Sequence, residues 1–195
     1  MSGDDLLAAL MPVVRCLEAL GVAHYVGGSL ASSALGMPRT TLDADLVAEL
    51  EPWHVDPFVR ALERDYYVSA PMIREAMQRQ SCFNVIHLAT SFKVDVFFVK
   101  SRPYDRVSLG RIQRGPLGGS EQDIDVWLAS PEDVVLNKLE WYRQGQRISE
   151  RQWLDVQGVL KVQRGRLDRD YLHKWAQQLD VADLLEEALH EAGIE

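Results

Sequence analysis

Two short stretches, Tyr25-Val-Gly-Gly-Ser29 and Arg39-Thr-Thr-Leu-Asp43-Ala-Asp45, decide the interpretation of this 195-residue chain. They place a glycine turn and a hydroxyl one short helix ahead of two carboxylates. If residues 42–50 form a strand, Asp43 and Asp45 point to the same face, because strand side chains alternate with a period of two. Two carboxylates on one face repel each other and raise each other's pKa unless a cation lies between them. We therefore expect a cation beside this strand.

A third carboxylate, Asp95, lies within the apolar run Phe92-Lys-Val-Asp-Val-Phe-Phe-Val99. An isolated ionised acid in such a strand is costly, so a cation or another partner is expected. We expect Lys93 to point to the opposite face and therefore not to be that partner. Mg²⁺ prefers oxygen ligands and is usually held by one or two carboxylates together with substrate phosphates. The pattern predicts an Mg²⁺ or Mn²⁺ site formed by Asp43, Asp45 and Asp95.

This combination resembles the nucleotidyltransferase superfamily of the DNA polymerase β type. In that family a Gly-Gly/Ser turn, an Asp-x-Asp on the following strand and a third Asp on a later strand form the active site. The matching residues here are Gly27, Gly28 and Ser29, then Asp43 and Asp45, then Asp95. The resemblance implies an NTP as substrate, phosphate binding at the glycine turn, and catalytic and metal-binding roles for the three acids.

Each motif taken alone has a second interpretation. The turn at Gly27, Gly28 and Ser29 could wrap a phosphate, because glycine lets the backbone approach closely and aim its N–H groups, but it is also typical of a plain strand-to-helix turn. The pair formed by Asp43 and Asp45 is equally compatible with a solvated strand face. Their order and spacing together favour an active site.

The chain after residue 128 resembles the AbiEii/MenT toxin-like nucleotidyltransferases. In AbiEii-type enzymes a helix opened by Ser and Pro carries a lysine, and a later helix carries an Arg-to-Asp segment. Here Ser130-Pro131 precedes Lys138, and Arg151-Gln-Trp-Leu-Asp155 matches the second feature without the usual basic residue before the acid. The resemblance implies that Lys138 faces Ser29 across a groove and binds phosphate. The alternative is a lysine whose charge reaches solvent.

Arg39 is the second candidate cation, because it directly precedes the Asp-x-Asp strand. If Lys138 lies far from the glycine turn, Arg39 is the next residue expected to neutralise a triphosphate.

The resemblance implies an Mg²⁺-dependent enzyme that moves a nucleoside monophosphate from an NTP to a hydroxyl of an RNA, such as tRNA, or of a protein. The toxin-like features also imply an antitoxin partner. Two alternatives stay open: a non-catalytic binding or regulatory module with the same fold, and transfer to a small molecule, as in the aminoglycoside nucleotidyltransferases. Three retained acids favour an enzyme, because a non-catalytic module has no need to hold three carboxylates together.

Composition limits the class of protein. The formal net charge of −8 argues against a surface covered with nucleic-acid contacts. No apolar run approaches the ~20 residues of a membrane span, and the acidic N-terminus does not resemble a signal peptide. Cys16 and Cys82 have no metal-ligand spacing and are expected to be buried free thiols of a cytoplasmic protein. Four arginines form either ordinary solvated faces or a basic rim beside the metal site: Arg102, Arg106, Arg111 and Arg114.

Hydrophobic periodicity predicts an α+β fold, a mixed sheet flanked by helices and followed by a helical tail. Strands are expected at 22–26, 42–50, 66–69, 82–89, 92–99, 111–116 and 124–128, with a turn at Gly118-Gly119. Helices are expected at 4–20, 30–35, 53–64 and 71–80, and then from Pro131 almost to the end. The tail aromatics Trp141, Tyr142 and Trp153 are expected to pack between helices. We divide the chain into a catalytic domain, 1–128, and a helical subdomain, 129–195.

Overall fold

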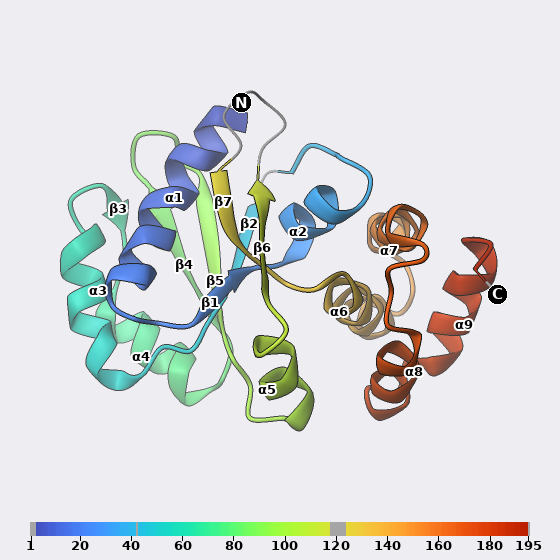
Figure 1. Cartoon of the computed structure of the whole chain (residues 1–195). Coiled ribbons are helices and arrows are strands. Elements are labelled where there is room, and N and C mark those ends of the chain that lie inside the picture. The colour runs from blue at the N-terminus through green and yellow to red at the C-terminus, as the bar shows by residue number, and fades with distance from the viewer. Residues whose placement is uncertain (1–2, 42, 118–123, 195) are drawn as a thin grey trace.

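The structure is a computed structural model that describes residues 3–41, 43–117 and 124–194. Its strands are β1 (His24–Val26), β2 (Asp43–Ala48), β3 (Tyr66–Tyr67), β4 (Cys82–His87), β5 (Lys93–Phe98), β6 (Gln113–Leu117) and β7 (Ile124–Leu128). They form one mixed sheet in the order β3-β4-β5-β2-β1-β7-β6 (Figure 1). The expected α+β class and mixed sheet are confirmed, and the predicted Gly118-Gly119 turn lies outside the described residues.

Helices lie on both sides of the sheet (Figure 1). The described helices are α1 (Gly3–Ala19), α2 (Gly28–Leu35), α3 (Val55–Leu62), α4 (Ala70–Gln78), α5 (Pro103–Leu109), α6 (Pro131–Gln144), α7 (Glu150–Gln163), α8 (Arg169–Gln178) and α9 (Ala182–Glu191), with a 3-10 turn η1 (Pro52–His54). The helix α5 was not predicted from the sequence, because it is too short to show a clear apolar period. Its only strong signal is Pro103 at the first helical position, where a missing N–H costs nothing.

The alternation of side chains along the central strands separates two faces of the sheet. On β2 the residues Ala44, Leu46 and Ala48 are buried, and on β5 the same is true of Val94 and Val96. These residues meet α1 and its neighbours in one hydrophobic core. The intervening positions of both strands are only partly covered or exposed. The sheet therefore has one closed face and one partly open face, and the open face carries the polar residues.

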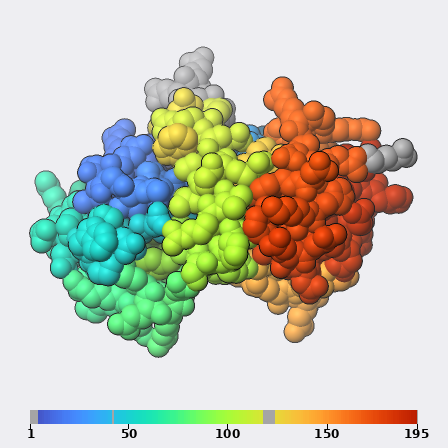
Figure 2. Space-filling view, turned by 60° about the horizontal axis from the view of Figure 1, so that its bottom comes forward, coloured from blue at the N-terminus to red at the C-terminus, as the bar shows by residue number. Residues whose placement is uncertain are grey.

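The start of α6 fixes the orientation of the helical tail relative to the sheet. Ser130 caps the helix, because its hydroxyl oxygen accepts a hydrogen bond from the N–H of Asp133 at 3.1 Å, and Pro131 occupies the first turn. The tail helices form a block on one side of the molecule, with the segment around α5 between this block and the first helices (Figure 2). The core continues from the sheet into the tail.

Two sequence expectations about side-chain burial need correction. Cys16 is buried as expected, whereas Cys82 is exposed, because it begins β4 on the partly open face of the sheet. Tyr142 and Trp153 pack together with ring centroids 5.2 Å apart, but Trp141 is 54% exposed. Among the described helices, none is both long and apolar enough to cross a membrane.

Candidate active site

The three candidate acids lie on two neighbouring strands. β2 pairs with β5 in parallel, and the register places Asp45 directly opposite Asp95 and Asp43 opposite Lys93. Because residues two apart share a face, all three carboxylates project from the partly open face. Like charges held directly opposite each other destabilise a sheet. This arrangement therefore has a cost that a bound cation would offset.

Asp45 is the acid that packs against the glycine turn. A Cβ atom added to Gly28 would fall 1.7 Å from Asp45 Oδ2, and Gly28 has a φ of +52°. The backbone N–H of Ser29 donates to the same carboxylate, which favours its ionised form. Burial nevertheless raises the pKa of Asp45 above its ordinary value, and the charge of Asp95 raises it further. An additional cation beside Asp45 would therefore stabilise its ionised carboxylate.

The glycine turn has fewer unpaired N–H groups than the sequence suggests. The N–H of Gly27 donates to the backbone oxygen of Asp45 at 2.9 Å and so continues the pairing of β1 with β2 one residue beyond Val26. The N–H of Ser29 is taken by the Asp45 carboxylate. In this structure neither group is directed at an open phosphate site.

Asp95 has two partners on the sheet. Lys93 Nζ lies 2.7 Å from Asp95 Oδ2, and the side-chain amide of Asn84 on β4 donates to the other carboxylate oxygen. The expectation that Lys93 points away from Asp95 is wrong, because the two residues are two positions apart on one strand and share a face. Sequence reasoning missed Asn84, since only the antiparallel register of β4 and β5 brings it opposite Asp95.

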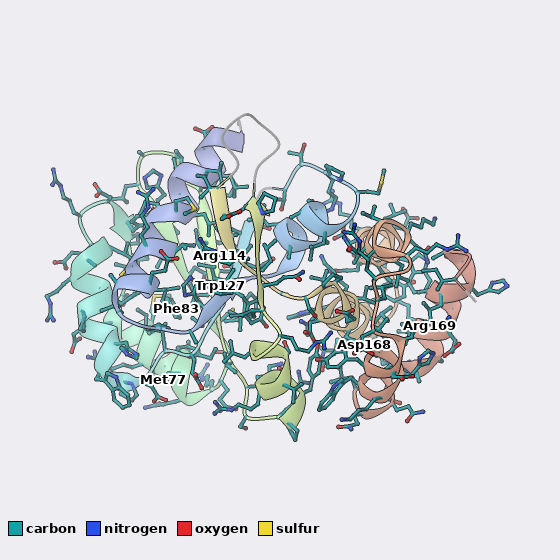
Figure 3. All side chains as sticks on the ribbon, viewed as in Figure 1. Met77, Phe83, Arg114, Trp127, Asp168 and Arg169 are labelled. Carbon is teal, nitrogen blue, oxygen red and sulfur yellow. The ribbon has the colours of Figure 1, made fainter. Side chains whose placement is uncertain are left out.

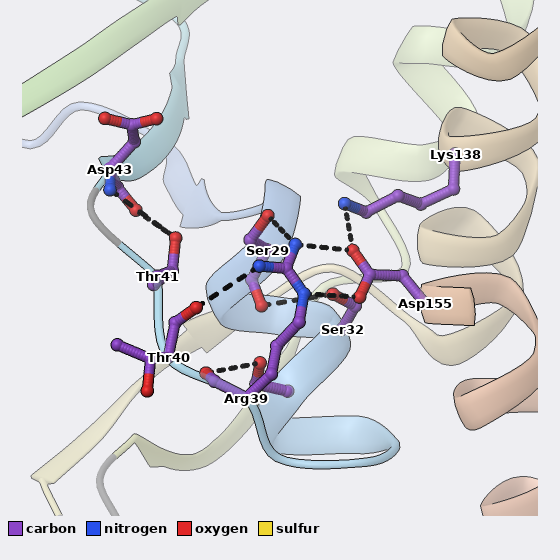
Figure 4. A network of polar contacts seen from close by, with 9 residues as sticks. Ser29, Ser32, Arg39, Thr40, Thr41, Asp43, Lys138 and Asp155 are labelled. Carbon is purple, nitrogen blue, oxygen red and sulfur yellow. Dashed lines mark hydrogen bonds and ion pairs between the residues drawn. The ribbon is translucent and has the colours of Figure 1, made fainter. Parts of the chain in front are cut away.

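A buried ion network joins the turn to the tail helices (Figure 4). Arg39 donates to both carboxylate oxygens of Asp155, at 2.7 and 2.9 Å, and to the Ser29 hydroxyl at 2.6 Å. Lys138 Nζ lies 2.7 Å from Asp155 Oδ2. Lys138 and Asp155 are only 5% and 6% exposed. Both candidate cations therefore lie beside the glycine turn, and one acid holds them there.

The ionisation of Asp155 is set by these two cations. Burial alone would raise its pKa, but hydrogen bonds from Arg39 and Lys138 outweigh burial, and the pKa lies below its ordinary value. The same bond to Asp155 raises the pKa of Arg39. The Arg-to-Asp segment of the sequence contained Asp155, but no local pattern could reveal its pairing with Arg39, 116 positions away in the chain.

A cavity of about 300 Å³ opens beside this network. Its polar end is lined by Gly28, Ser29, Asp45 and Lys138. Its apolar part is lined by Val47 of β2, Phe97 of β5, Val99 directly after β5, and Trp141 of α6. This volume lies at the small end of the range of small-molecule sites, about 300–1,000 Å³.

The four arginines of residues 101–120 do not form a free basic rim. Each pairs with at least one carboxylate: Arg102 with Asp105 and Glu140, Arg106 with Glu49, Arg111 with Glu132, and Arg114 with Glu18. Figure 3 shows Arg114 beside Trp127, whose ring centroid lies 5.4 Å from its guanidinium carbon. Arg102 lines the cavity, whereas Arg111 and Arg114 line a second cavity beside β6. The solvated-face interpretation fits these arginines better.

The carboxylates fit a Mg²⁺ ion whose remaining ligands come from the substrate and water. Within the described residues, no group of three or more His, Cys, Asp or Glu side chains is gathered closely enough to hold a metal ion. The expected site of three acids is therefore not preassembled. Mg²⁺ needs only one or two carboxylates when phosphates and waters supply its other oxygen ligands. Asp45 and Asp95, opposite each other on paired strands, supply that number.

Comparison with solved structures shows that this chain has the same fold as several nucleotidyltransferase structures. The antibiotic-resistance factor ANT(2'')-Ia has a TM-score of 0.59 and 11% identity, with 97% of this chain and 100% of that chain covered. An antigenic nucleotidyltransferase-like protein from Paracoccidioides brasiliensis has a TM-score of 0.55 and 18% identity, with 100% and 96% covered. A Thermotoga maritima protein described as a candidate nucleotidyltransferase has a TM-score of 0.51 and 16% identity, with 80% and 96% covered.

At these identities the likeness establishes the fold alone, and the chain has the nucleotidyltransferase fold. No protein-family model matches the chain, and no curated protein matches it in sequence. The activity must therefore be argued from the site.

Proposed function

We propose that this protein is an Mg²⁺-dependent nucleotidyltransferase that uses Asp43, Asp45 and Asp95 as its acidic site. The observation that carries the proposal is the pairing of Asp45 with Asp95 in register, beside Gly28 and at the polar end of a cavity. Asp45 and Asp95 would hold the metal, with the exposed Asp43 at its outer edge. Bound Mg²⁺ would neutralise charge on the phosphates where bonds form and break.

The residues around the turn would bind the triphosphate. The Ser29 hydroxyl, Arg39 and Lys138 bring a hydrogen-bonding group and two cations to one place. Gly28 lets the backbone approach a phosphate closely, and Gly27 supports it from within the sheet. Because Asp155 carries one negative charge against two cations, the network keeps positive charge that a phosphate can use.

The reaction follows from this placement. Asp95 would accept the proton of the acceptor hydroxyl, whose oxygen forms a bond to the α-phosphorus of the NTP. The bond between that phosphorus and the bridging oxygen breaks, and pyrophosphate leaves. Lys93 and Asn84 hold the Asp95 carboxylate on the open face of the sheet, where an acceptor can reach it.

We propose an RNA, such as tRNA, or a protein hydroxyl as acceptor, in keeping with the AbiEii/MenT-like order of features in the tail. Ser130 and Pro131 open the helix that carries Lys138, and Asp155 follows on the next helix. On this proposal residues 1–128 form the catalytic part and 129–195 a helical part that supplies Lys138 and Asp155. A cytoplasmic enzyme restrained by an antitoxin partner completes the proposal.

A non-catalytic binding module is the second candidate, and one observation favours it. Lys93 already places a cation 2.7 Å from Asp95, where a metal-binding carboxylate would otherwise be unpaired. Such a module would bind an NTP without transferring it.

Incubation of the protein with each α-labelled NTP, Mg²⁺ and either tRNA or cell extract separates these functions. The enzyme is expected to place label on RNA or protein, and Asp45→Asn to abolish the transfer. Asp56→Asn, which changes an exposed acid paired with Arg74, is the matched control and should keep full activity. Label on a small molecule would identify the aminoglycoside-type alternative, and NTP binding without any transfer would identify the binding module.

A further inference from the structure

An exposed row of apolar side chains runs along α7. Leu154 and Val162 lie about two helical turns apart on this helix, and they are 66% and 52% exposed. Gly158 lies between them on the same side, because residues four apart are neighbours on a helix surface. Met37, from the segment after α2, covers Gly158, since a Cβ atom added to this glycine would lie 3.3 Å from both Cβ and Cγ of Met37. Leu154, Met37 and Val162 therefore form one continuous surface, the α7 row.

The α7 row faces away from the rest of the protein. α2, α6 and α9 pack around α7 (Figure 1). Met37 is 65% exposed, and the exposure of all three side chains shows that no described element covers the row. A single exposed apolar side chain is ordinary, whereas several that lie together mark an interaction surface.

Two basic residues lie beside the α7 row. Arg151 precedes Leu154 by three residues and Lys161 follows it by seven, so all three lie on one side of the helix. Both basic residues are exposed, and neither has an ion pair with any described residue. Elsewhere in the tail, by contrast, Arg143 and Arg147 both pair with an acid of α9. The row therefore has unneutralised positive charge at its edge, in a chain with a net charge of −8.

The combination of apolar row and unpaired cations favours one kind of occupant. RNA phosphates would use the cations but gain nothing from the apolar side chains, and the row has no aromatic ring on which a base could stack. A second copy is disfavoured, because a two-fold pairing of α7 with itself brings Arg151 and Lys161 of one copy near the same two cations of the other. A helix with acidic residues beside an apolar stripe buries the row and pairs both cations.

We propose that the α7 row is a docking site for a partner protein that presents an acidic amphipathic helix. The row spans about 12 Å, the length of about two helical turns, and so accepts about two turns of the partner helix. The inference deepens the partner part of the proposed function and rests on it for the expectation that a partner exists. The row contains none of the acids or cations of the candidate active site.

Fluorescence anisotropy with three labelled model helices tests the proposal. The first peptide has leucines at positions i, i+4 and i+8 flanked by glutamates. The second has lysines in place of the glutamates, and the third has glutamines in place of the leucines. We expect the first peptide to bind with a Kd below about 100 μM, and the other two to bind at least about tenfold more weakly.

A leucine variant tests the apolar contact. Leu154→Gln should weaken binding of the glutamate peptide by about fivefold or more. Leu88→Gln is the matched control, because Leu88 is similarly exposed, at 58%, but lies directly after β4. This control should bind the peptide as the wild type does. Equal binding by both variants would show that the peptide does not occupy the α7 row.

A charge reversal tests the ionic contact. The double variant R151E/K161E should reverse the preference, so that the lysine peptide binds more tightly than the glutamate peptide. The control R15E/R60E changes the net charge by the same amount at exposed positions on α1 and α3 and should keep the wild-type preference. If both double variants behave alike, the preference reflects net charge and not the α7 row.

The remaining outcomes decide between occupants. Equal affinity for the three peptides, or no binding of the glutamate peptide below about 1 mM, overturns the proposal. It is also overturned if single-stranded RNA binds the wild type and not R151E/K161E, which assigns the face to nucleic acid. A dimer in size-exclusion chromatography that dissociates in Leu154→Gln assigns the face to a second copy and overturns it as well.

The transfer assay separates this inference from the proposed function. Leu154→Gln should transfer label as the wild type does, because the residue lies outside the candidate active site. If the wild type transfers no label and binds no NTP, the proposed function fails, while the peptide measurements still decide whether the α7 row is a docking site.

Discussion

Gly28 and Asp45 are in direct contact, with the carboxylate of Asp45 occupying the space that a side chain at position 28 would need. A Cβ atom there would lie 1.7 Å from Oδ2 and 2.8 Å from Cβ of Asp45. The glycine turn and the Asp-x-Asp strand are therefore one structural unit. A side chain at position 28 therefore requires the Asp45 carboxylate to move.

Gly28→Ala is expected to destabilise the protein and to abolish NTP binding. The positive φ alone costs about 1–2 kcal/mol for a residue with a side chain, and the clash with Asp45 adds about 1–3 kcal/mol. Gly165→Ala is the matched control, since Gly165 also has a positive φ, +88°, but has no atom within 4 Å of an added Cβ. Denaturant unfolding of both variants separates the two costs. Equal destabilisation would contradict the contact between Gly28 and Asp45.

Asp155→Asn should destabilise the protein by about 3–5 kcal/mol, because it leaves Lys138 buried without its ionic partner. Arg39 loses the same partner but is less buried and can reach solvent. Asp56→Asn breaks an exposed pair with Arg74 and should cost less than about 1 kcal/mol. Urea unfolding at pH 7 provides the comparison. If Asp155→Asn lowers the unfolding free energy no more than Asp56→Asn does, the network of Arg39, Lys138 and Asp155 contributes little to stability.

The contribution of Asp155 should also depend on pH. Its pKa in the folded protein lies below the ordinary value of 3.8, so the folded state holds its proton less tightly than the unfolded state does. Its stabilisation is therefore complete above pH 3.8 and is lost as the pH falls through the folded pKa. The difference in unfolding free energy between wild type and Asp155→Asn should be constant from pH 5 to 7 and shrink below about pH 4. A difference that grows on acidification would contradict this assignment.

The local patterns of the sequence predicted much of the fold. The period of two predicted β2 and β5, and Ser130-Pro131 predicted the start of α6. Both predictions succeeded because strand alternation and helix capping act over a few residues. The short helix α5 was missed because seven residues give too few turns for an apolar period to appear.

Contacts between distant residues could not be predicted in the same way. The position of Asn84 opposite Asp95 depends on strand register, and Asp155 meets Arg39 only because α7 packs beside α2. The wrong prediction that Lys93 points away from Asp95 has a different cause. Its spacing from Asp95 was visible in the sequence, and the period-two rule that grouped Asp43 with Asp45 groups Lys93 with Asp95 as well.

Asp45→Asn is expected to stabilise the fold while it removes activity. The Asp45 carboxylate is partly buried opposite Asp95, and an amide relieves that repulsion while keeping an oxygen for the Ser29 N–H. Stabilising substitutions at functional sites commonly add about 0.5–2 kcal/mol. Thermal unfolding without ligand should give a higher Tm than for the wild type, and calorimetry should detect no Mg²⁺-dependent NTP binding. A lower Tm would mean that Asp45 serves the fold, and unchanged binding would remove it from the metal site.

Lys93→Met tests whether this lysine competes with Mg²⁺ for Asp95. The ammonium group lies 2.7 Å from the carboxylate, so its removal leaves three acids on the open face with one cation fewer. The Mg²⁺ concentration that gives half-maximal NTP binding should then fall by about two- to tenfold. The effect is modest because Lys93 is 42% exposed and solvent screens its charge. Lys161→Met, which removes an exposed lysine on α7, is the control and should leave the Mg²⁺ requirement unchanged. If Lys93→Met raises the Mg²⁺ requirement, the lysine orients Asp95 for the metal and does not compete with it.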